Sequence, residues 1–508
     1  MVIPSPIIEL ETISKSFGPV QANKNISLKI QPGTIHGIVG ENGAGKSTLM
    51  SILYGFYKAD SGTIKVHGKR VSIVDSQTAI DQGIGMVFQH FKLVENFTVL
   101  ENIILGAEGG NLIGRSLTNA RQTLKKLAED YELNVDPDSV IDGISVGMQQ
   151  RVEILKALYR KAEILILDEP TGVLTPAEAE HLFRILKNLK AEGKTIVLIT
   201  HKLKEIMNAT DTVSVMRQGE MTSTLTTNET SPEQLAELMV GRKVLLRVEK
   251  EPSKAGRTIL ACQNLNYIDT KGVCRLRDVS FKINAGEILG IAGVAGNGQS
   301  ELLEVLAGIN RSDGKLTINS TNIDLDSRQS NPLNRRHLGI SHVPEDRQKL
   351  GLIMEFYAWE NMALGYHDRD EYRQNGFFMD NSVIKSQTEN RFRHFDIRPD
   401  NPNLMAKSFS GGNQQKIVLA REIEQNPDLL IVGQPTRGVD IGAIEFIHKR
   451  LIKMRDAGKA VLLISVELDE ILSLSDRILV MFDGRIMGEK ETSKTNETEL
   501  GLLMAGVN

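Results

Sequence analysis

The sequence predicts an α/β protein built from two tandem domains that repeat one another. Its 508 residues exceed the roughly 250–300 residues at which a single hydrophobic core stops growing. Residues 25–50 match residues 278–303 along their whole length, and residues 164–175 match residues 429–440. A repeat of this size indicates two related domains rather than a solenoid, whose repeats span roughly 20–50 residues.

The boundary between the two copies is predicted from composition. Residues 242–256 are rich in charge and contain proline and glycine, which is typical of a linker. We therefore expect a first domain at residues 1–245, a linker at 246–256 and a second domain at 257–508.

Each half alternates short apolar runs with longer amphipathic stretches. Runs of Ile, Val and Leu suited to buried strands lie at residues 36–40, 83–88, 164–168 and 195–200. Apolar residues with helical spacing mark residues 148–161 and 177–193. This alternation of strand and helix predicts a largely parallel sheet in each half.

The composition favours a protein of the cytosol or of a membrane surface. The net charge of −4 does not suggest a nucleic-acid binder. The two cysteines, Cys262 and Cys274, are too few for a disulfide framework and fit a reducing compartment. No apolar run approaches the ~20 residues of a membrane span, and the first residues do not have the pattern of a signal peptide.

The segment "GENGAGKST" (residues 40–48) follows a predicted strand and opens a predicted helix. This is the context that a phosphate-binding loop requires, and every position of its pattern fits, so a plain glycine-rich turn is a poor alternative. We expect Lys46 to reach the β- and γ-phosphates and the Ser47 hydroxyl to bind Mg²⁺. The residues predicted to contact the nucleotide here are Gly40, Glu41, Asn42, Gly43, Ala44, Gly45, Lys46, Ser47 and Thr48.

Further polar residues follow other predicted strands. The run "ILILDEP" (residues 164–170) ends in Asp168, predicted to hold Mg²⁺, and Glu169, predicted to polarise the attacking water. Gln89 is predicted to ligate Mg²⁺, and His201 to hydrogen-bond the γ-phosphate. Because the carboxyl ends of parallel strands form the ligand crevice of an open α/β sheet, these residues are expected to converge.

The order of these motifs resembles that of the ATP-binding cassette (ABC) ATPases. It runs from an aromatic residue (Phe17) through the phosphate loop and Gln89 to a signature-like "ISVGMQQ" (residues 144–150), the Asp-Glu strand and a histidine. Phe17 is then expected to stack on adenine, although a core phenylalanine is nearly as good an interpretation. The resemblance covers nearly all of both halves. It implies two nucleotide-binding domains, each with a mainly parallel core sheet, an antiparallel β edge and a helical subdomain, which bind ATP and Mg²⁺.

The second half has lost the chemical groups of the first. The positions of Lys46, Gln89, Asp168, Glu169 and His201 hold, in that order, Gln299, Glu345, Gly433, Gln434 and Val466. We expect hydrolysis there to be more than about 1000-fold slower.

The signature segments differ in the opposite sense. "FSGGNQQ" (residues 409–415) is close to the family pattern, whereas Val146 replaces a signature glycine in the first half. In the family, each ATP lies between the phosphate loop of one cassette and the signature of the other. The resemblance therefore implies one competent site, made of Lys46, Glu169 and His201 as catalytic residues and a signature in trans. The predicted signature contacts are Ser410, Gly411, Gly412 and Gln414.

Tandem cassettes with this asymmetry resemble the ATPase subunits of bacterial importers for simple sugars and nucleosides, and residues 86–106 are more similar to the nucleoside branch. The resemblance implies two transmembrane permease subunits and an extracytoplasmic solute-binding protein as partners, no nucleic acid, and a peripheral place on the cytoplasmic face of the plasma membrane through the permease alone. The apolar segment after Gln89 is expected to form the core of a small helical subdomain, a docking groove for a permease helix, or both. Thr175 departs from the family pattern, since Asp440 stands at its counterpart.

Three other protein classes fit less well. A soluble tandem ABC ATPase acting on ribosomes generally keeps both catalytic glutamates and a long basic linker, but Gln434 stands at the second glutamate position. A DNA-repair ABC protein would need a long coiled coil or a zinc hook. A non-enzymatic nucleotide sensor does not explain the intact Lys46, Asp168 and Glu169.

Overall fold

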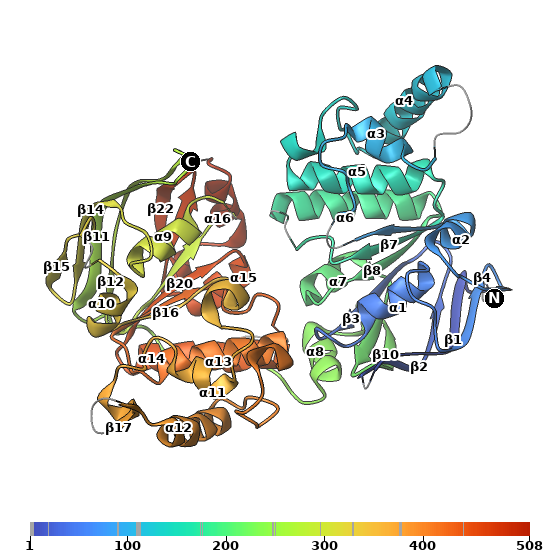
Figure 1. Cartoon of the computed structure of the whole chain (residues 1–508). Helices are drawn as coiled ribbons and strands as arrows, with labels where there is room; N and C mark the ends of the chain where they lie inside the picture. Colours follow the sequence, from blue (N-terminus) through green and yellow to red (C-terminus); the bar gives the residue numbers. More distant parts are fainter. Residues whose placement is uncertain are drawn as a thin grey trace. The chain divides into compact units, whose positions relative to one another are not determined.

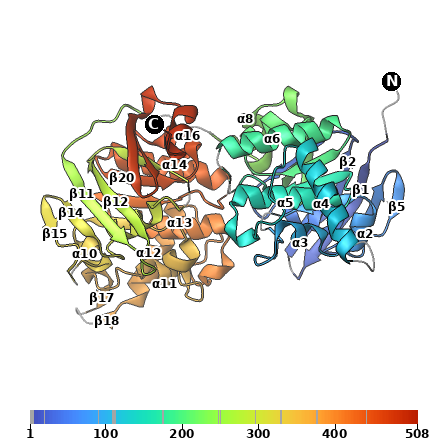
Figure 2. The same ribbon diagram turned by 90° about the horizontal axis from the view of Figure 1, so that it is seen from above.

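The computed structural model divides the chain into two compact units, residues 1–244 and 245–508, which we describe separately (Figures 1 and 2). The residues described are 5–18, 20–88, 91–107, 113–172, 174, 176–245, 248, 250–294, 296–327, 330–374, 378–439 and 441–507.

The first unit contains a six-stranded and a four-stranded sheet. The larger has the order β10-β9-β3-β8-β7-β6, in which only the β10–β9 pair is antiparallel. The smaller, β2-β1-β4-β5, is antiparallel throughout. The strands are β1 (Ile8–Phe17), β2 (Val20–Ile30), β3 (Ile35–Gly40), β4 (Ser61–Val66), β5 (Lys69–Val71), β6 (Ile84–Val87), β7 (Ile164–Asp168), β8 (Thr195–Ile199), β9 (Thr212–Arg217) and β10 (Glu220–Thr226).

Local sequence sets the helix ends of this unit. Thr98 and Glu101 form a capping box at the start of α3, and the left-handed Gly241 (φ 84°) ends α8. The helices are α1 (Lys46–Leu53), α2 (Ser76–Asp81), α3 (Val99–Ile104), α4 (Ile113–Asp130), α5 (Val146–Tyr159), α6 (Pro176–Ala191), α7 (Leu203–Ala209) and α8 (Pro232–Val240).

The six-stranded sheet is buried on both faces. Along β7, Ile164 and Ile166 pack with α1 and the antiparallel sheet, whereas Leu165 and Leu167 pack with α3 to α6. Figure 1 shows α3 to α6 gathered on one side of this sheet. A strand buried on both faces reads as a continuous apolar run, which is why "ILIL" was recognisable in the sequence. Each of these side chains stabilises the fold by about 1.5–3 kcal/mol on burial.

The second unit repeats this plan. Its six-stranded sheet has the order β16-β19-β20-β13-β21-β22, with only the β21–β22 pair antiparallel, and its four-stranded antiparallel sheet is β12-β11-β14-β15. The strands are β11 (Thr258–Ile268), β12 (Cys274–Asn284), β13 (Ile288–Ala292), β14 (Asp313–Ile318), β15 (Thr321–Ile323), β16 (Ile340–Val343), β17 (Arg373–Gln374), β18 (Phe378–Met379), β19 (Leu429–Gly433), β20 (Ala460–Ser465), β21 (Arg477–Phe482) and β22 (Arg485–Glu491). The helices are α9 (Gln299–Leu306), α10 (Pro332–His337), α11 (Ala358–Ala363), α12 (Asn381–His394), α13 (Gly411–Ile423), α14 (Ile441–Asp456), α15 (Leu468–Leu474) and α16 (Glu497–Met504).

The prediction of two α/β halves, each with a mainly parallel sheet, an antiparallel sheet edge and a helical part, is confirmed. The apolar segment after Gln89 supplies core residues in the first unit, because Val99, Leu100 and Ile103 pack with α4 and α5. Residues 353–365 are the corresponding segment of the second unit, and their Trp359 is also buried, in a small cluster that includes Tyr366 and Tyr372.

Part of the expected linker packs on the second unit. The Lys250 ammonium group donates to the carbonyls of Leu474 and Ser475 at 2.8 and 2.6 Å, and the Ser253 hydroxyl donates to the Gly286 carbonyl at 2.9 Å. Among all helices described, none combines the length and the apolar character needed to cross a bilayer.

Candidate functional site

The predicted phosphate loop of the first unit connects β3 to α1. Gly43 and Gly45 have φ angles of 81° and 98°, a region that residues with a Cβ rarely adopt. A Cβ on Gly45 would also collide with the Ala22 carbonyl, and the buried Asn23 amide donates to the Gly45 carbonyl at 3.1 Å. The loop is therefore fixed against β2.

Lys46 lies across the base of this loop. Its side chain is 6% exposed, and its ammonium group donates to the carbonyls of Gly40 (2.7 Å) and Glu41 (3.0 Å). Burial lowers the pKa of Lys46, and the charges of Glu169 and Asp168 act in the opposite direction. A buried cation at the start of a helix is suited to bind phosphate oxygens.

Asp168, at the end of β7, is next to Ser47. Burial raises the pKa of Asp168, while a hydrogen bond from the Ser47 hydroxyl lowers it. Asp168 is 6% exposed, and its Oδ1 atom has no hydrogen-bond partner among the described residues. A buried carboxylate oxygen without a partner, beside a hydroxyl, fits a divalent cation with hard oxygen ligands. The residues present therefore fit Mg²⁺.

Glu169 and His201 come from neighbouring strand ends and form a pair. The Nδ1 atom of His201 lies 2.8 Å from Oε1 of Glu169, and the Glu169 backbone donates to the Ile199 carbonyl at 2.9 Å. Burial raises the pKa of Glu169, but the hydrogen bond and charge of His201, together with Lys46, outweigh it and hold this pKa below its ordinary value. Glu169 is thus kept ionised, as a base that polarises water must be.

Thr171, Thr200 and Glu205 form a polar cluster next to the Glu169–His201 pair that the sequence analysis did not predict. The buried Glu205 carboxylate accepts hydrogen bonds from the hydroxyls of Thr171 and Thr200, the second at 2.9 Å. It thereby joins the segments that follow β7 and β8, which carry Glu169 and His201. Threonine and glutamate are common in helices and loops, so no sequence pattern distinguished these three residues.

Two predicted residues lie outside the described part of the chain, Gln89 and Thr175. Phe17 ends β1 and is 42% exposed, so it is not a core residue, and its ring contacts Tyr57 edge-on at 5.1 Å. An exposed aromatic side chain is free to stack on a planar ligand.

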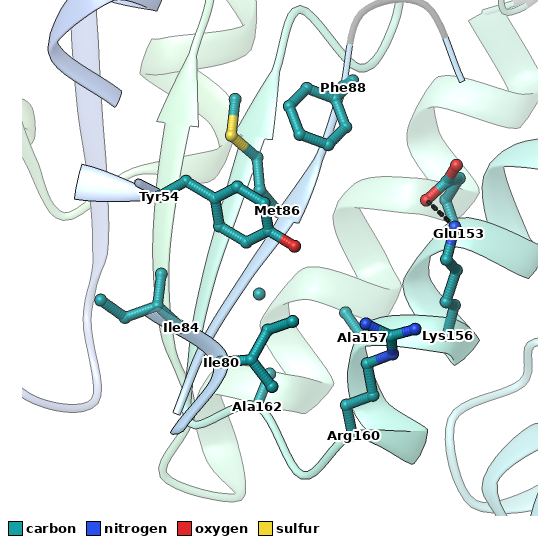
Figure 3. Close-up of a pocket in the computed structure, with 11 residues that line it drawn as sticks. Tyr54, Ile80, Ile84, Met86, Phe88, Glu153, Lys156, Ala157, Arg160 and Ala162 are labelled. Atoms are coloured by element: carbon teal, nitrogen blue, oxygen red, sulfur yellow. Dashed lines mark ion pairs between the residues drawn. The ribbon is translucent and has the colours of Figure 1, made fainter. Parts of the chain in front are cut away.

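A pocket opens beside β6 and α5 (Figure 3). Tyr54, Met86 and Phe88 supply apolar walls, and Arg160 donates to the Leu105 carbonyl at 2.5 Å. Glu153, which is 3% exposed, accepts from the Lys92 backbone at 2.7 Å, and its pKa is raised by burial. The pocket contains both apolar and charged side chains, and Glu153 and Arg160 link it by hydrogen bonds to the backbone of the segment that follows Gln89.

The two signature-like segments each start a helix. Ser145 caps α5, which begins at the exposed Val146, and Ser410 caps α13, which begins at Gly411. The Gln414 side chain is buried in its own unit, where it donates to the carbonyls of Ala406 (3.2 Å) and Phe409 (3.1 Å). The Gly411 backbone is close-packed, because a Cβ there would lie 3.0 Å from the Gly438 carbonyl.

Comparison with known proteins places the chain in a family. The family model described as "ABC transporter" matches residues 23–172 and 276–437. The chain is 47% identical to the nucleoside import ATP-binding protein NupA of Lactococcus lactis, covering 99% of this chain and 98% of that protein. It is 48% identical to the guanosine import ATP-binding protein NupO of Bacillus subtilis, covering 98% and 97%.

A ribose import ATP-binding protein, RbsA of Clostridium tetani, is 35% identical over 97% of this chain and 96% of its own length. Among solved structures, a nucleotide-free ATP-binding cassette from an ABC transporter is 29% identical, covering 43% of this chain and 90% of that one, with a TM-score of 0.39. The family match in both units, and identity of this extent over the full length, show that the chain belongs to the ABC transporter family.

Proposed function

We propose that this chain is the ATP-hydrolysing subunit of an importer for nucleosides or simple sugars, with nucleosides the favoured solute. The chain is an ATPase coupled to transport, because both units match the ABC transporter family and its relatives are import ATP-binding proteins. The single observation that best supports ATP hydrolysis at this site is the hydrogen-bonded Glu169–His201 pair next to Lys46. Nucleosides are favoured because the relatives at 47% and 48% identity are nucleoside and guanosine importers, whereas the ribose importer is 35% identical.

Each residue of the site has a distinct role in ATP hydrolysis. Lys46 binds phosphate oxygens, and Glu169 accepts a proton from the attacking water. His201 holds the Glu169 carboxylate and, from the same position, hydrogen-bonds the γ-phosphate. Ser47 and Asp168 would hold Mg²⁺, which neutralises phosphate charge when bound.

The competent site is completed by the signature of the second half. This part of the proposal rests on the sequence: "FSGGNQQ" keeps the family pattern, and Val146 departs from it. Ser410, Gly411 and Gly412 start a helix whose backbone N–H groups are suited to phosphate. Gln414 supports that helix start through its two carbonyl contacts.

The pocket beside β6 is proposed as the docking surface for a permease helix. It combines an apolar wall of Tyr54 and Phe88 with the charges of Glu153 and Arg160, and these two charged residues hydrogen-bond the backbone of the segment that follows Gln89, the predicted Mg²⁺ ligand. Two permease subunits and an extracytoplasmic binding protein are the proposed partners. The chain then associates with the cytoplasmic side of the membrane through the permease.

Uptake by cells tests this function directly. Cells that lack the gene should lose uptake of a radiolabelled nucleoside, and the wild-type gene should restore it, whereas the Glu169→Gln variant should not. Uptake of labelled ribose serves as the comparison: loss of ribose uptake alone would move the solute to the sugar branch. Unchanged uptake of both, with the chain sedimenting with ribosomes, would contradict an import function.

A further inference from the structure

We propose that Arg347 is a positioning residue for ATP hydrolysis, because its guanidinium group holds the signature start at Gly411 against the segment that follows β19. The backbone donors of the signature then meet the γ-phosphate from a fixed position. The inference rests on the proposed function, since it requires that the signature of the second unit completes the competent site. Arg347 itself is assigned no contact with ATP.

Arg347 lies in a segment that is longer in the second unit than in the first. The segment between Glu345 and Tyr357 has three more residues than its counterpart between Gln89 and Thr98. Tyr357 and Thr98 are equivalent positions, because each is the N-cap residue of the short helix that follows, α11 in one unit and α3 in the other. The unit that keeps the signature pattern is therefore also the unit that carries the longer segment.

This segment contains a π-helical turn (Arg347–Gly351) that is fixed at both ends. At its start, the Asp346 carboxylate accepts a hydrogen bond from the Gln348 backbone at 3.0 Å. At its end, Nη1 of Arg421, which lies on α13, donates to the Gly351 carbonyl at 2.8 Å. Single π-helical turns are rare and often occur at functional sites. This one is attached to the helix that begins with the signature.

The Arg347 guanidinium group contacts two backbone segments of the second unit. Its Nη1 atom donates to the Arg437 carbonyl, in the segment after β19, at 2.7 Å. Its Nη2 atom lies against the start of α13, because a Cβ on Gly411 would be 2.5 Å from it. The same nitrogen would be 3.5 Å from a Cβ on Gly438. One side chain thus joins the signature start to the turn after β19.

Glycine at position 411 is what allows this arrangement. A side chain there would displace the guanidinium group of Arg347, and the Gly438 carbonyl, 3.0 Å from the same Cβ, closes the other side. The first unit has the exposed Val146 at this position, and its counterpart segment, residues 90–97, contains no arginine. The glycine and the arginine therefore occur together in the unit whose signature is intact.

The charge of Arg347 has no ion-pair partner among the residues that the structure describes. The neighbouring Asp346 carboxylate lies 3.8 Å from the Lys349 ammonium group instead, and Nε of Arg347 is buried without a hydrogen-bond partner. Burial lowers the pKa of Arg347. A cation at the N-terminal end of a helix is electrostatically unfavourable until an anion binds there. The arrangement therefore suits the phosphate that the proposed function places at the signature.

A neighbouring side chain of the same turn supports the helix start. The Gln348 amide donates to Oε1 of Gln414 at 3.2 Å, and the Gln414 amide donates in turn to the carbonyls of Ala406 and Phe409. The first turn of α13 is thus fixed by Arg347 on one side and by this chain of hydrogen bonds on the other. Because a displacement of about 1 Å can lower a rate by roughly 100-fold, fixing these donors matters for hydrolysis.

Two substitutions in the full chain test the role of Arg347. Arg347→Met keeps the apolar stem but removes the charge and the donors, and it should lower kcat for ATP hydrolysis by at least about tenfold. Arg347→Lys keeps the charge and one donor group, and its kcat should stay within about threefold of wild type. Equilibrium dialysis with labelled ATP in EDTA should show unchanged affinity in both variants, because the first phosphate loop is untouched. Lys349→Met, on the same turn with a side chain that is 84% exposed, is the matched control and should retain wild-type kcat.

A double-mutant cycle covers the case in which Arg347→Met fails to fold. Gly411→Ala brings its Cβ against Nη2 of Arg347, whereas a lysine has no second nitrogen at that place. The factor by which Gly411→Ala lowers kcat should therefore be at least about threefold smaller in the Arg347→Lys chain than in the wild type. Equal factors in the two chains would overturn the proposed contact between these residues.

Ser410→Ala separates a failure of this inference from a failure of the proposed function. If the signature completes the competent site, this substitution should lower kcat, and a wild-type kcat would contradict that part of the proposed function. A lowered kcat in Ser410→Ala together with a wild-type kcat in Arg347→Met would overturn the role of Arg347 alone. Equal losses of kcat in the Met and Lys variants, or a loss of ATP affinity that matches the loss of kcat, would also overturn it.

Discussion

His201 Nδ1 lies 2.8 Å from Glu169 Oε1, although the two residues are 32 positions apart in the chain. Parallel pairing of β7 with β8 produces this proximity, because Asp168 is in register with Ile199. Glu169 itself has a φ angle of 47°, and so does its counterpart Gln434 at 46°. Such a backbone conformation costs of order 1–3 kcal/mol and is retained where it serves to aim a side chain. We infer that the turn after β7 exists to point position 169 at position 201.

Glu169→Gln should abolish ATP turnover, whereas Gln434→Glu should leave it unchanged. The amide has nearly the size of the carboxylate but cannot accept the proton, so phosphate release should fall by more than about 1000-fold. Restoring a glutamate at 434 does not restore a lysine at 299 or a histidine at 466. Substantial phosphate release by the Glu169 variant would show that another residue is the base.

His201→Ala should lower kcat by about 100-fold or more and lower ATP affinity by a much smaller factor, because the imidazole is proposed to hydrogen-bond the γ-phosphate as well as Glu169. The imidazole contacts Glu169 directly, and losing one preorganised group of this kind typically costs about 100–1000-fold in rate. Steady-state phosphate release gives kcat, and equilibrium binding of ATP gives the affinity. His181→Ala, a partly exposed histidine on α6, is the matched control and should retain wild-type kcat. A fall in affinity that matches the fall in kcat would instead assign His201 to ground-state binding.

The sequence predicted the site residues that belong to a recognisable motif at the end of an apolar strand. It did not predict contacts that depend on how side chains from different elements pack together. Strand ends at Gly40 and Asp168 could be predicted because buried parallel strands are continuous apolar runs, and their carboxyl ends meet at one edge. The contact of Ser300 with Glu345 could not, because the sequence comparison showed only that Glu345 replaces a glutamine. The crowding at Gly433, where a Cβ would lie 2.5 Å from Cδ1 of Leu303 and 2.6 Å from Cγ of Glu345, is likewise not contained in any linear pattern.

Gly45→Ala should weaken ATP binding far more than Gly43→Ala. Both glycines have positive φ angles, so both substitutions carry backbone strain of about 1 kcal/mol. Only at Gly45 would the new Cβ also collide with the Ala22 carbonyl, since nothing lies within 4 Å of a Cβ on Gly43. The loop can relieve that collision only by moving away from β2, which displaces the start of α1. Equilibrium dialysis with ATP checks this, and equal losses in the two variants would show that strain alone matters.

Acid should loosen the first unit through His36. This residue is 2% exposed in β3, its ring nitrogens hydrogen-bond Ser214 and Thr212 at 2.8 Å each, and burial lowers its pKa from 6.5 to about 4. Between pH 6.5 and pH 4 the unfolded chain binds a proton at His36 that the folded chain does not. The contribution of His36 to the free energy of unfolding is therefore fully present above pH 6.5 and is lost as the pH falls below that value. From pH 7 to pH 5 the loss is about 2 kcal/mol. Hydrogen exchange of the β3 amides should accelerate accordingly, and His36→Gln should flatten this pH dependence. His342 in the second unit has a similarly lowered pKa, so the readout must be specific to β3. If the β3 amides of His36→Gln exchanged with the same pH dependence as those of the wild type, His36 would not be its source.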